Sequence, residues 1–306
     1  MDFAAGEALG DVEATGVATH DGLRLAAWRH PAKRPAPRAR VVLVHGYAEH
    51  AARYAWVAAS LGAAGYECHL FDLRGHGRSE GPRGHVARFA DYVDDLDRVV
   101  HQASGGGDAA GSPRGDGPGA TPRIPLFAVG HSLGGLIALE YVRLRRGVFD
   151  VLAASSPFLA PAFRLPPLVE ALGSLASHVL PSRTVKSTLS AEWLSHDAAV
   201  VKAYARDPLI FDTVTLGWFR EVRSAQEEML RRAGEIRLPV LFLLGDADRV
   251  ADWRRSTAVF ERLGSADKCL KVYPRFFHEV LNEIGREEVL GDLLVWLDGH
   301  SAAPPG

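Results

Sequence analysis

The sequence has little net charge and no region of concentrated basic charge. Among its 306 residues, 35 Lys and Arg stand against 37 Asp and Glu, which gives a formal net charge of −2. A nucleic-acid-binding domain concentrates basic residues, and a disordered chain combines low hydrophobicity with high net charge. With a hydrophobic content of 47%, the chain fits neither class. The composition predicts a globular protein without a nucleic-acid partner.

Cysteines are also scarce, since only Cys68 and Cys269 are present. Both stand in apolar runs typical of buried strands and lie far apart in the sequence. We therefore expect two unbridged thiols that pack as small hydrophobic groups. A chain of this length buries a sizeable core without a disulfide or metal staple.

The sequence lacks segments that would direct the chain to or across a membrane. Residues 1–30 contain no basic stretch followed by an apolar stretch, which is the pattern of a signal peptide. The longest hydrophobic runs fall short of the roughly 20 residues that a membrane-spanning helix needs. We therefore expect a cytoplasmic protein.

What the sequence does contain is a series of short aliphatic and β-branched runs. Such runs form strands buried on both faces of a parallel sheet. They occupy residues 41–44, 67–71, 126–129, 151–154, 240–244 and 269–273. Helical periodicity appears between most of them, at residues 89–101, 133–146, 253–263 and 286–297. This alternation predicts an α/β fold, with a mostly parallel sheet covered by helices on both faces.

Three segments depart from the alternation. Residues 12–28 alternate in polarity around Asp21-Gly22, which predicts a β-hairpin. Residues 103–123 are rich in Gly, Pro and Ser and predict a flexible surface loop. Residues 157–235 show helical patterns without a buried strand and predict a helical cap. Residues 1–156 and 236–306 would then form the two parts of the core domain.

The run at 126–129 leads directly into Gly130-His131-Ser132-Leu133-Gly134-Gly135, which a helical segment follows. A G-x-S-x-G motif between strand and helix is the nucleophile elbow of α/β-hydrolases. The glycines let strand and helix approach closely while the serine takes a strained backbone conformation. The motif alone is weakly specific, but this context makes Ser132 the candidate nucleophile.

A serine hydroxyl needs a base, and this fold supplies the acid and then the histidine later in the chain. Residues 197–299 contain a single histidine, His278, just after the last predicted strand. The acid should follow the preceding strand, where Asp248 is the favoured candidate and Asp246 the alternative. Asp252 is better suited to capping the next helix.

An oxyanion hole completes such a site. In this fold one amide follows the nucleophile and the other lies in the loop after an early strand. The first is the amide of Leu133. For the second, residues 45–47 are candidates, and Tyr47 is favoured.

Several blocks in order resemble the monoacylglycerol lipase and lysophospholipase group of α/β-hydrolases, and the likeness covers nearly the whole chain. The blocks are His45-Gly46-Tyr47-Ala48-Glu49-His50 with Arg53-Tyr54, Asp72 with residues 75–81, the elbow at residues 130–132, Trp193-Leu194-Ser195, Tyr204 with Asp207-Pro208-Leu209, and residues 245–249 with His278.

The resemblance implies an α/β-hydrolase fold with an inserted helical cap, a Ser132, Asp248 and His278 triad, and no cofactor. It also implies that Glu49 and Arg53 lie at the polar end of the pocket, where the alcohol leaves. The alternative is an ion pair that braces the loop after the first core strand. Mammalian members carry a second histidine where this chain has Leu281. The resemblance therefore does not extend to their manner of glycerol recognition.

The predicted cap contains an apolar helical stripe of Leu168, Leu172, Leu175 and Val179. One interpretation packs this stripe on the core or along an acyl pocket. The other leaves part of it exposed, to lie on a lipid interface. The second interpretation would make the protein peripheral to a membrane or micelle.

The remaining histidines of the motifs, His45, His76 and His131, are expected to orient loops. The sequence shows no metal-ligand spacing, no P-loop ending and no dinucleotide-binding glycine pattern. The sequence therefore predicts a serine ester hydrolase that acts on a lipid ester, either a monoacylglycerol or a lysophospholipid. The alternatives are a short-chain carboxylesterase, a peptidase or acyltransferase, and a non-catalytic binding protein.

Overall fold

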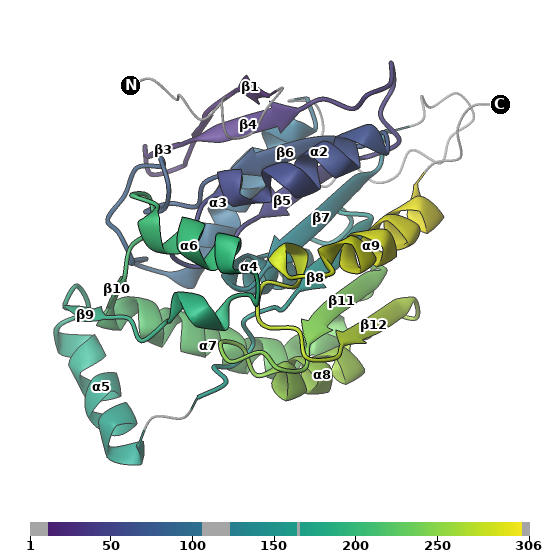
Figure 1. Ribbon diagram of the computed structural model, residues 1–306. Helices are drawn as coiled ribbons and strands as arrows, with labels where there is room; N and C mark the ends of the chain where they lie inside the picture. Colours follow the sequence, from purple (N-terminus) through teal and green to yellow (C-terminus); the bar gives the residue numbers. More distant parts are fainter. Residues whose placement is uncertain (1–11, 106–122, 164–165, 302–306) are drawn as a thin grey trace.

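The computed structural model describes residues 12–105, 123–163 and 166–301 (Figure 1). Its strands include β1 (Glu13–Ala14), β4 (Ala27–His30), β5 (Arg40–Val44), β6 (Glu67–Phe71), β7 (Leu126–His131), β8 (Val151–Ser155), β11 (Val240–Gly245) and β12 (Lys268–Tyr273). They form one eight-stranded sheet in the order β1-β4-β6-β5-β7-β8-β11-β12. Pairing is parallel from β6 to β12 and antiparallel where β4 joins β6 and β1.

Helices cover both faces of the sheet. One face packs against α2 (Ala55–Ala63) and α9 (Arg286–His300), and the other against α3 (Phe89–Ala103), α4 (Leu133–Leu144) and α8 (Trp253–Arg262). Every residue of β7 and β11 is buried as a result. The six predicted strands and four predicted helices are confirmed. Sequence periodicity did not single out α2, because apolar side chains surround its whole circumference.

The predicted hairpin is also confirmed. Strands β2 (Val17–Ala18) and β3 (Arg24–Leu25) pair antiparallel across a turn in which Gly22 has a φ of 87°. Both cysteines are free, and four strands of the sheet separate Cys68 in β6 from Cys269 in β12. Of the predicted loop at residues 103–123, residues 106–122 lie outside the described residues.

Residues 157–235, the inserted segment, connect β8 to β11. They contain α5 (Pro167–Val179), β9 (Thr184–Lys186), η2 (Ala191–Trp193), α6 (Ala198–Arg206), β10 (Thr213–Thr215), α7 (Leu216–Arg232) and η3 (Ala233–Glu235). Figure 1 shows these elements together beside the sheet, with α5 at the outer end. The segment is mainly helical, as expected, but β9 and β10 pair as a short antiparallel ribbon that the sequence analysis missed.

Three of the four residues in the apolar stripe of α5 are not packed on the core, and the side chain of Leu168 lies outside what the structure describes. Leu172, Leu175 and Val179 are 58%, 67% and 73% exposed, so the interpretation of a buried stripe is wrong for them. The cause is the way α5 packs along α7. Ser177 is the buried residue of this contact, and its carbonyl accepts a hydrogen bond from Arg220 of α7. The larger apolar side chains therefore point outward.

In the described part of the chain, no helix is both long enough and apolar enough to cross a bilayer.

Candidate active site

The turn between β7 and α4 holds Ser132 in a conformation that L-residues rarely adopt, with φ 52° and ψ −117°. Its amide donates to the Ser155 carbonyl, and its own carbonyl accepts from the Phe158 amide. Position 134 must be glycine because there is no space for a side chain. A Cβ there would lie 2.2 Å from the Val44 carbonyl oxygen, so a side chain would force α4 away from the neighbouring strand β5.

Ser132, His278 and Asp248 form a continuous chain of hydrogen bonds. Ser132 Oγ lies 2.9 Å from His278 Nε2, and His278 Nδ1 lies 2.7 Å from Asp248 Oδ2. All three residues stand at the carboxyl ends of parallel strands, because they follow β7, β12 and β11. The structure thus brings together the three residues that the sequence pattern singled out.

The acid loop, residues 246–252, distinguishes the three candidate aspartates. Asp248 is turned toward His278, and its other oxygen accepts from the amides of Val250 and Ala251. Asp246 instead accepts from the Arg275 amide at 2.6 Å, and Asp252 caps α8. The preference for Asp248 over Asp246, and the capping role of Asp252, agree with the structure.

The electrostatics of the site favour a charged His278. Burial is the largest single influence and lowers the pKa, but the adjacent Asp248 carboxylate, together with the nearby Glu279 and Glu49, raises it, and the net pKa lies above the ordinary value. His131, whose ring centre is 4.8 Å from that of His278, behaves in the opposite way. Burial and the neighbouring His278 hold its pKa well below the ordinary range.

Two backbone amides near Ser132 are candidates for an oxyanion hole. Gly46 and Tyr47 line the same pocket as Ser132, and Leu133 follows Ser132 as the first residue of α4. Among the described residues, neither the Tyr47 amide nor the Leu133 amide donates to a protein acceptor. Preorganised donors of this kind can stabilise a developing oxyanion.

Glu49 and Arg53 both line the pocket, and the structure adds a third charged residue, Glu279. Arg53 donates to both carboxylates, and the side chains of all three residues are at most 10% exposed. Glu49 also accepts hydrogen bonds from the Gly46 amide and the Tyr54 hydroxyl. The two interpretations of Glu49 and Arg53 are therefore compatible, since the group braces the loop after β5 and borders the pocket.

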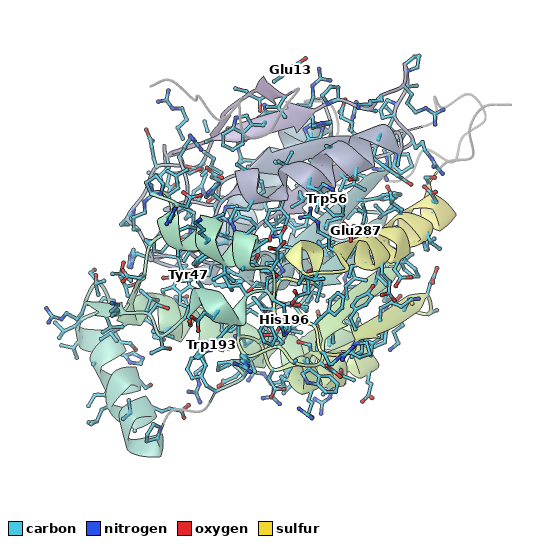
Figure 2. The ribbon with its side chains drawn as sticks, in the orientation of Figure 1. Glu13, Tyr47, Trp56, Trp193, His196 and Glu287 are labelled. Carbon is cyan, nitrogen blue, oxygen red and sulfur yellow. The ribbon has the colours of Figure 1, made fainter. Side chains whose placement is uncertain are left out.

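The rest of the pocket wall is mainly apolar and comes largely from the inserted segment. Its large side chains include Phe158, Leu189, Trp193, Leu194, Trp218 and Phe219. Figure 2 shows Tyr47 and Trp193 on the side of the molecule where the inserted segment meets the core. Such a wall suits a hydrophobic ligand.

The remaining motif histidines join loops. His45 accepts from the Leu73 amide and contacts the Gly46 carbonyl, while His131 contacts Ser155. Asp72 has a similar place, because its carboxylate accepts from the amides of Ala51 and Arg78. These contacts fix the loops around the pocket, in agreement with the expected role of the histidines.

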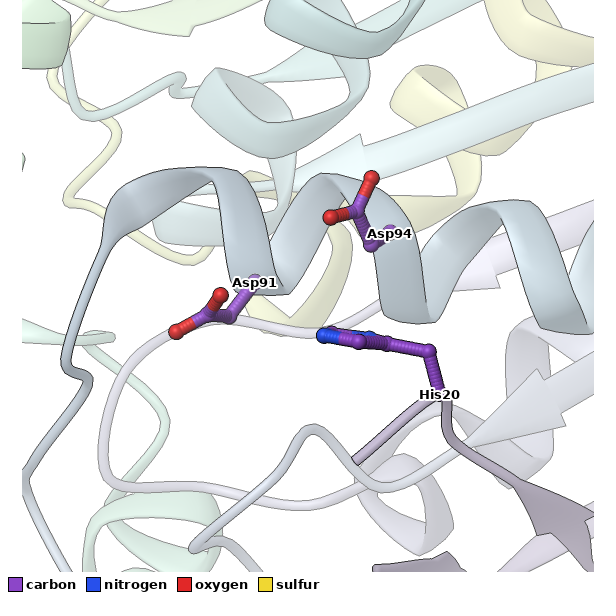
Figure 3. Close-up of side chains that lie close together, drawn as sticks. All are labelled: His20, Asp91 and Asp94. Atoms are coloured by element: carbon purple, nitrogen blue, oxygen red, sulfur yellow. The ribbon is translucent and has the colours of Figure 1, made fainter. Parts of the chain in front are cut away.

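A second acidic group lies away from the pocket, where His20 approaches Asp91 and Asp94 of α3 (Figure 3). Asp91 pairs with Arg88 at 2.6 Å, and Asp94 pairs with Arg145 at 3.2 Å. Since arginines already balance both carboxylates, we assign no metal to this group.

Comparisons with known proteins show the family to which the chain belongs. A family model described as "Serine aminopeptidase, S33" matches residues 35–285. A monoacylglycerol lipase of Mycolicibacterium smegmatis is 35% identical over 265 residues, which are 86% of this chain and 89% of that protein. The chain belongs to the monoacylglycerol lipase-like serine hydrolases.

A solved structure and a further relative are also similar to this serine hydrolase. A monoacylglycerol lipase structure from Paleococcus ferrophilus matches with a TM-score of 0.79 at 29% identity, covering 90% of this chain and 99% of that one. The protein therefore has the α/β-hydrolase fold. Phospholipase YtpA of Bacillus subtilis is 27% identical over 264 residues, which are 86% of this chain and 95% of that protein.

Sequence reasoning missed two glutamates of this serine hydrolase site. Glu279 directly follows His278, and the buried Glu283 lies four residues further on. Their adjacency to the only histidine in the predicted window was the available signal. Neither position belongs to a motif, so their contacts become visible only in the folded chain.

Proposed function

We propose that this protein is a serine ester hydrolase that cleaves the acyl ester of a monoacylglycerol. The observation that carries the proposal is the hydrogen-bond chain from Asp248 through His278 to Ser132, at the edge of a pocket with apolar walls. In this arrangement Ser132 is the nucleophile, His278 the general base and Asp248 the group that orients His278.

The reaction takes two acyl-transfer steps. His278 Nε2 accepts the Ser132 proton while Oγ attacks the ester carbonyl carbon, and the Tyr47 and Leu133 amides stabilise the resulting oxyanion. The imidazolium then donates its proton to the departing glycerol oxygen, which leaves an acyl group on Ser132. A water molecule, deprotonated by His278, attacks this acyl-enzyme and releases the fatty acid.

The pocket lining has an apolar part and a charged part, and both suit such a substrate. The apolar wall of Phe158, Trp193 and Phe219 favours the acyl chain, and the charged group around Arg53 favours the alcohol. A substrate with a long apolar tail and a small polar head matches both parts of the lining.

The charged group of Arg53, Glu49 and Glu279 favours a glycerol head group over a phosphate head group. Among the described residues that line the pocket, Arg53 is the single arginine or lysine, and it already binds both Glu49 and Glu279. A phosphate would have to displace a carboxylate from Arg53 and would add negative charge to a group with two carboxylates. A neutral glycerol head meets neither obstacle.

Active-site labelling tests the chemistry. A fluorophosphonate should modify the wild type at Ser132 and leave Ser132→Ala unlabelled, and both proteins should have the same melting temperature. Absence of a Ser132 adduct in folded wild type would overturn the proposal.

A substrate panel tests the class. It comprises p-nitrophenyl esters from C2 to C16, oleoylglycerol, the lysophosphatidylcholine and lysophosphatidylglycerol with the same chain, and amino-acid p-nitroanilides. We expect oleoylglycerol turnover roughly tenfold or more above either lysophospholipid. Equal turnover would contradict the head-group argument, and a C2–C4 optimum without glyceride turnover would favour a short-chain esterase. Anilide cleavage alone would favour a peptidase.

We also propose that the outer face of α5 contacts the lipid aggregate from which the substrate enters. Leu172, Leu175 and Val179 are exposed there, and half-exposed Phe219 belongs both to the pocket wall and to α7, on which α5 packs. Apolar side chains on one helical face bind lipid interfaces in this way. Flotation with neutral lipid vesicles should recover the wild type, and Leu172→Glu/Leu175→Glu should lose most of this binding while retaining p-nitrophenyl butyrate hydrolysis. Equal flotation would exclude the contact.

A further inference from the structure

His278 lies on a loop here called the base loop (residues 274–279). This loop contacts the end of β11 and the acid loop that follows it. The Ala247 amide donates to the Phe276 carbonyl, and the Arg275 amide donates to Asp246. A Cβ at Gly245 would lie 2.4 Å from the Phe276 carbonyl oxygen, so the end of β11 touches this loop directly. These contacts fix the base loop against the acid loop on the core side.

On its outer side, the base loop contributes the ring of Phe277 to a stack with two other side chains. His196 of the inserted segment lies on Phe277 with ring centres 3.7 Å apart and planes inclined by 27°. Arg249 of the acid loop places its guanidinium carbon 4.9 Å from the centre of the same ring. Figure 2 shows His196 where the inserted segment meets the loop after β12. The stack therefore joins the acid loop, the base loop and the inserted segment.

The same junction contains a buried carboxylate. Glu283, only 3% exposed, accepts from the Phe277 amide at 3.1 Å and from the Ile284 amide at 2.8 Å. The inserted segment supplies its other donors, which are His196 Nδ1, the His196 amide and the Ser195 hydroxyl. A buried carboxylate without such donors would be costly, so Glu283 binds the base loop and the inserted segment to each other.

The backbone reinforces this junction beside the catalytic histidine. The Glu279 amide donates to the Leu194 carbonyl at 2.8 Å, and the Ser195 hydroxyl donates to the Asn282 carbonyl at 2.9 Å. His278 thus stands between Phe277, which the stack holds, and Glu279, which the inserted segment holds.

We propose that His196 is a positioning residue for catalysis, which sets His278 against Ser132 by stacking on Phe277 and by donating to Glu283. This role rests on the proposed hydrolase function. It means that the inserted segment contributes to the chemical step as well as to the pocket wall. His196 does not touch the reacting atoms. It acts only through the base loop, and loss of its contacts leaves the outer side of that loop free to shift.

The size of the effect follows from the geometry of proton transfer. A base must lie within hydrogen-bond reach of the proton that it takes, and a misplacement of about 1 Å can cost roughly a hundredfold in rate. Because the core contacts remain, we expect His196→Ala to lower kcat for p-nitrophenyl butyrate roughly tenfold with KM unchanged.

Two conservative variants separate the two contacts. His196→Phe keeps a ring on Phe277 but loses the donor to Glu283, and His196→Asn keeps a donor but loses the ring. Each should recover part of the activity that His196→Ala loses. Glu283→Gln should act like His196→Ala, because an amide nitrogen would face donors. His178→Ala and Glu287→Gln are the matched controls, since both residues are exposed and neither takes part in the contacts of the junction described above.

The readouts are kcat, KM, the midpoint of the acid limb of the kcat/KM profile and the melting temperature. In His196→Ala the kcat should fall and the acid limb should move to lower pH, since a loosened His278 is held less closely to Asp248. Wild-type kcat and an unchanged acid limb in His196→Ala would overturn the proposal, whatever the melting temperature. If Glu283→Gln does not fold, the three His196 variants still test whether His196 positions His278. Failure of the wild type to label at Ser132 would instead refute the hydrolase function.

Discussion

The sheet and the inserted segment differ in how tightly their residues are held. In the sheet, every residue of β7 and β11 is buried, and a Cβ at Gly134 would meet a carbonyl oxygen at 2.2 Å. In the inserted segment, Leu175 and Val179 of α5 are 67% and 73% exposed, and a Cβ at Gly173 would meet nothing within 4 Å. The sheet leaves no space for an added side-chain atom at Gly134, while the outer helix of the inserted segment leaves such space at Gly173.

This difference matches a division of labour. The strands carry the candidate triad, whose geometry must hold within fractions of an ångström. The inserted segment supplies most of the apolar pocket wall. It is joined to the core by polar contacts, among them His50 to Asp207 at 2.8 Å and the Tyr47 hydroxyl to the Thr213 carbonyl at 2.7 Å. Variants in the sheet should therefore change chemistry or folding. Variants in the pocket wall of the inserted segment should change mainly substrate preference, whereas His196 acts on the chemistry through the base loop.

The largest expected effect lies in the acid loop. Asp248→Asn should lower kcat by roughly 10³–10⁴, because the amide no longer orients His278 or stabilises its charged form. Asp246→Asn is the control, since its side-chain oxygen can still accept from the Arg275 amide. Its kcat should stay within about twofold of wild type. Equal losses in steady-state p-nitrophenyl ester assays would contradict the assignment of Asp248.

A pair of glycine substitutions tests the contrast in packing. Gly134→Ala should destabilise the fold by roughly 3 kcal/mol or more, because the new methyl group would push α4 away from the end of β5. Gly173→Ala, in the interior of α5, should stabilise it by about 0.5–1 kcal/mol, since alanine favours the helix and nothing blocks its Cβ. Urea unfolding measures both. A neutral Gly134→Ala would show that the core is less constrained than its contacts indicate.

The pH dependence tests the electrostatics of the core. Burial lowers the pKa of His278, but Asp248 together with Glu279 and Glu49 outweighs burial, so the pKa lies above the ordinary value of about 6.5. Because the base must be neutral, kcat/KM should fall as pH drops through a midpoint above 6.5.

Stability should change in the opposite direction across the same window. A folded-state pKa above the unfolded one gives a stabilisation that is complete below pH 6.5 and is lost as pH rises through the folded pKa. In Asp248→Asn the residual activity should show an acid limb below 6.5, because burial then dominates. If the acid limb of the kcat/KM profile does not move in Asp248→Asn, that limb reports the titration of a group other than His278.

The smallest effect belongs to the inserted segment. Phe219→Ala removes a half-exposed part of the pocket wall and should lower the C16 to C4 preference roughly fivefold. Its rate of labelling by a small fluorophosphonate should match wild type. A slower labelling rate would mean that this wall also supports the chemistry.

The sequence identified the core strands and the three residues of the hydrogen-bond chain because their signals are local. A strand, a sharp turn and a helix surround Ser132, and a single histidine stands in the predicted window. The choice between Asp248 and Asp246 could only be ranked, because both lie on one loop. What separates them is the Arg275 amide, which occupies Asp246 and belongs to a loop 29 residues away.

The inserted segment was predictable in composition but not in orientation. Helical periodicity identifies the stripe of Leu172, Leu175 and Val179 but does not say which face of the helix meets the core. The packing of α5 on α7 decides this, and it turns the larger side chains outward. The contacts of His196 and Glu283 were equally invisible, since they join residues 87 positions apart.

The central claim is that the chemistry passes through an acyl group on Ser132. Rapid quenching of wild type with oleoylglycerol, followed by mass spectrometry of the digested protein, measures this directly. We predict a transient oleoyl group on the peptide that contains Ser132, and neither this adduct nor turnover in Ser132→Ala. An oleoyl group on another residue, or oleoylglycerol hydrolysis that persists in Ser132→Ala, would contradict the claim.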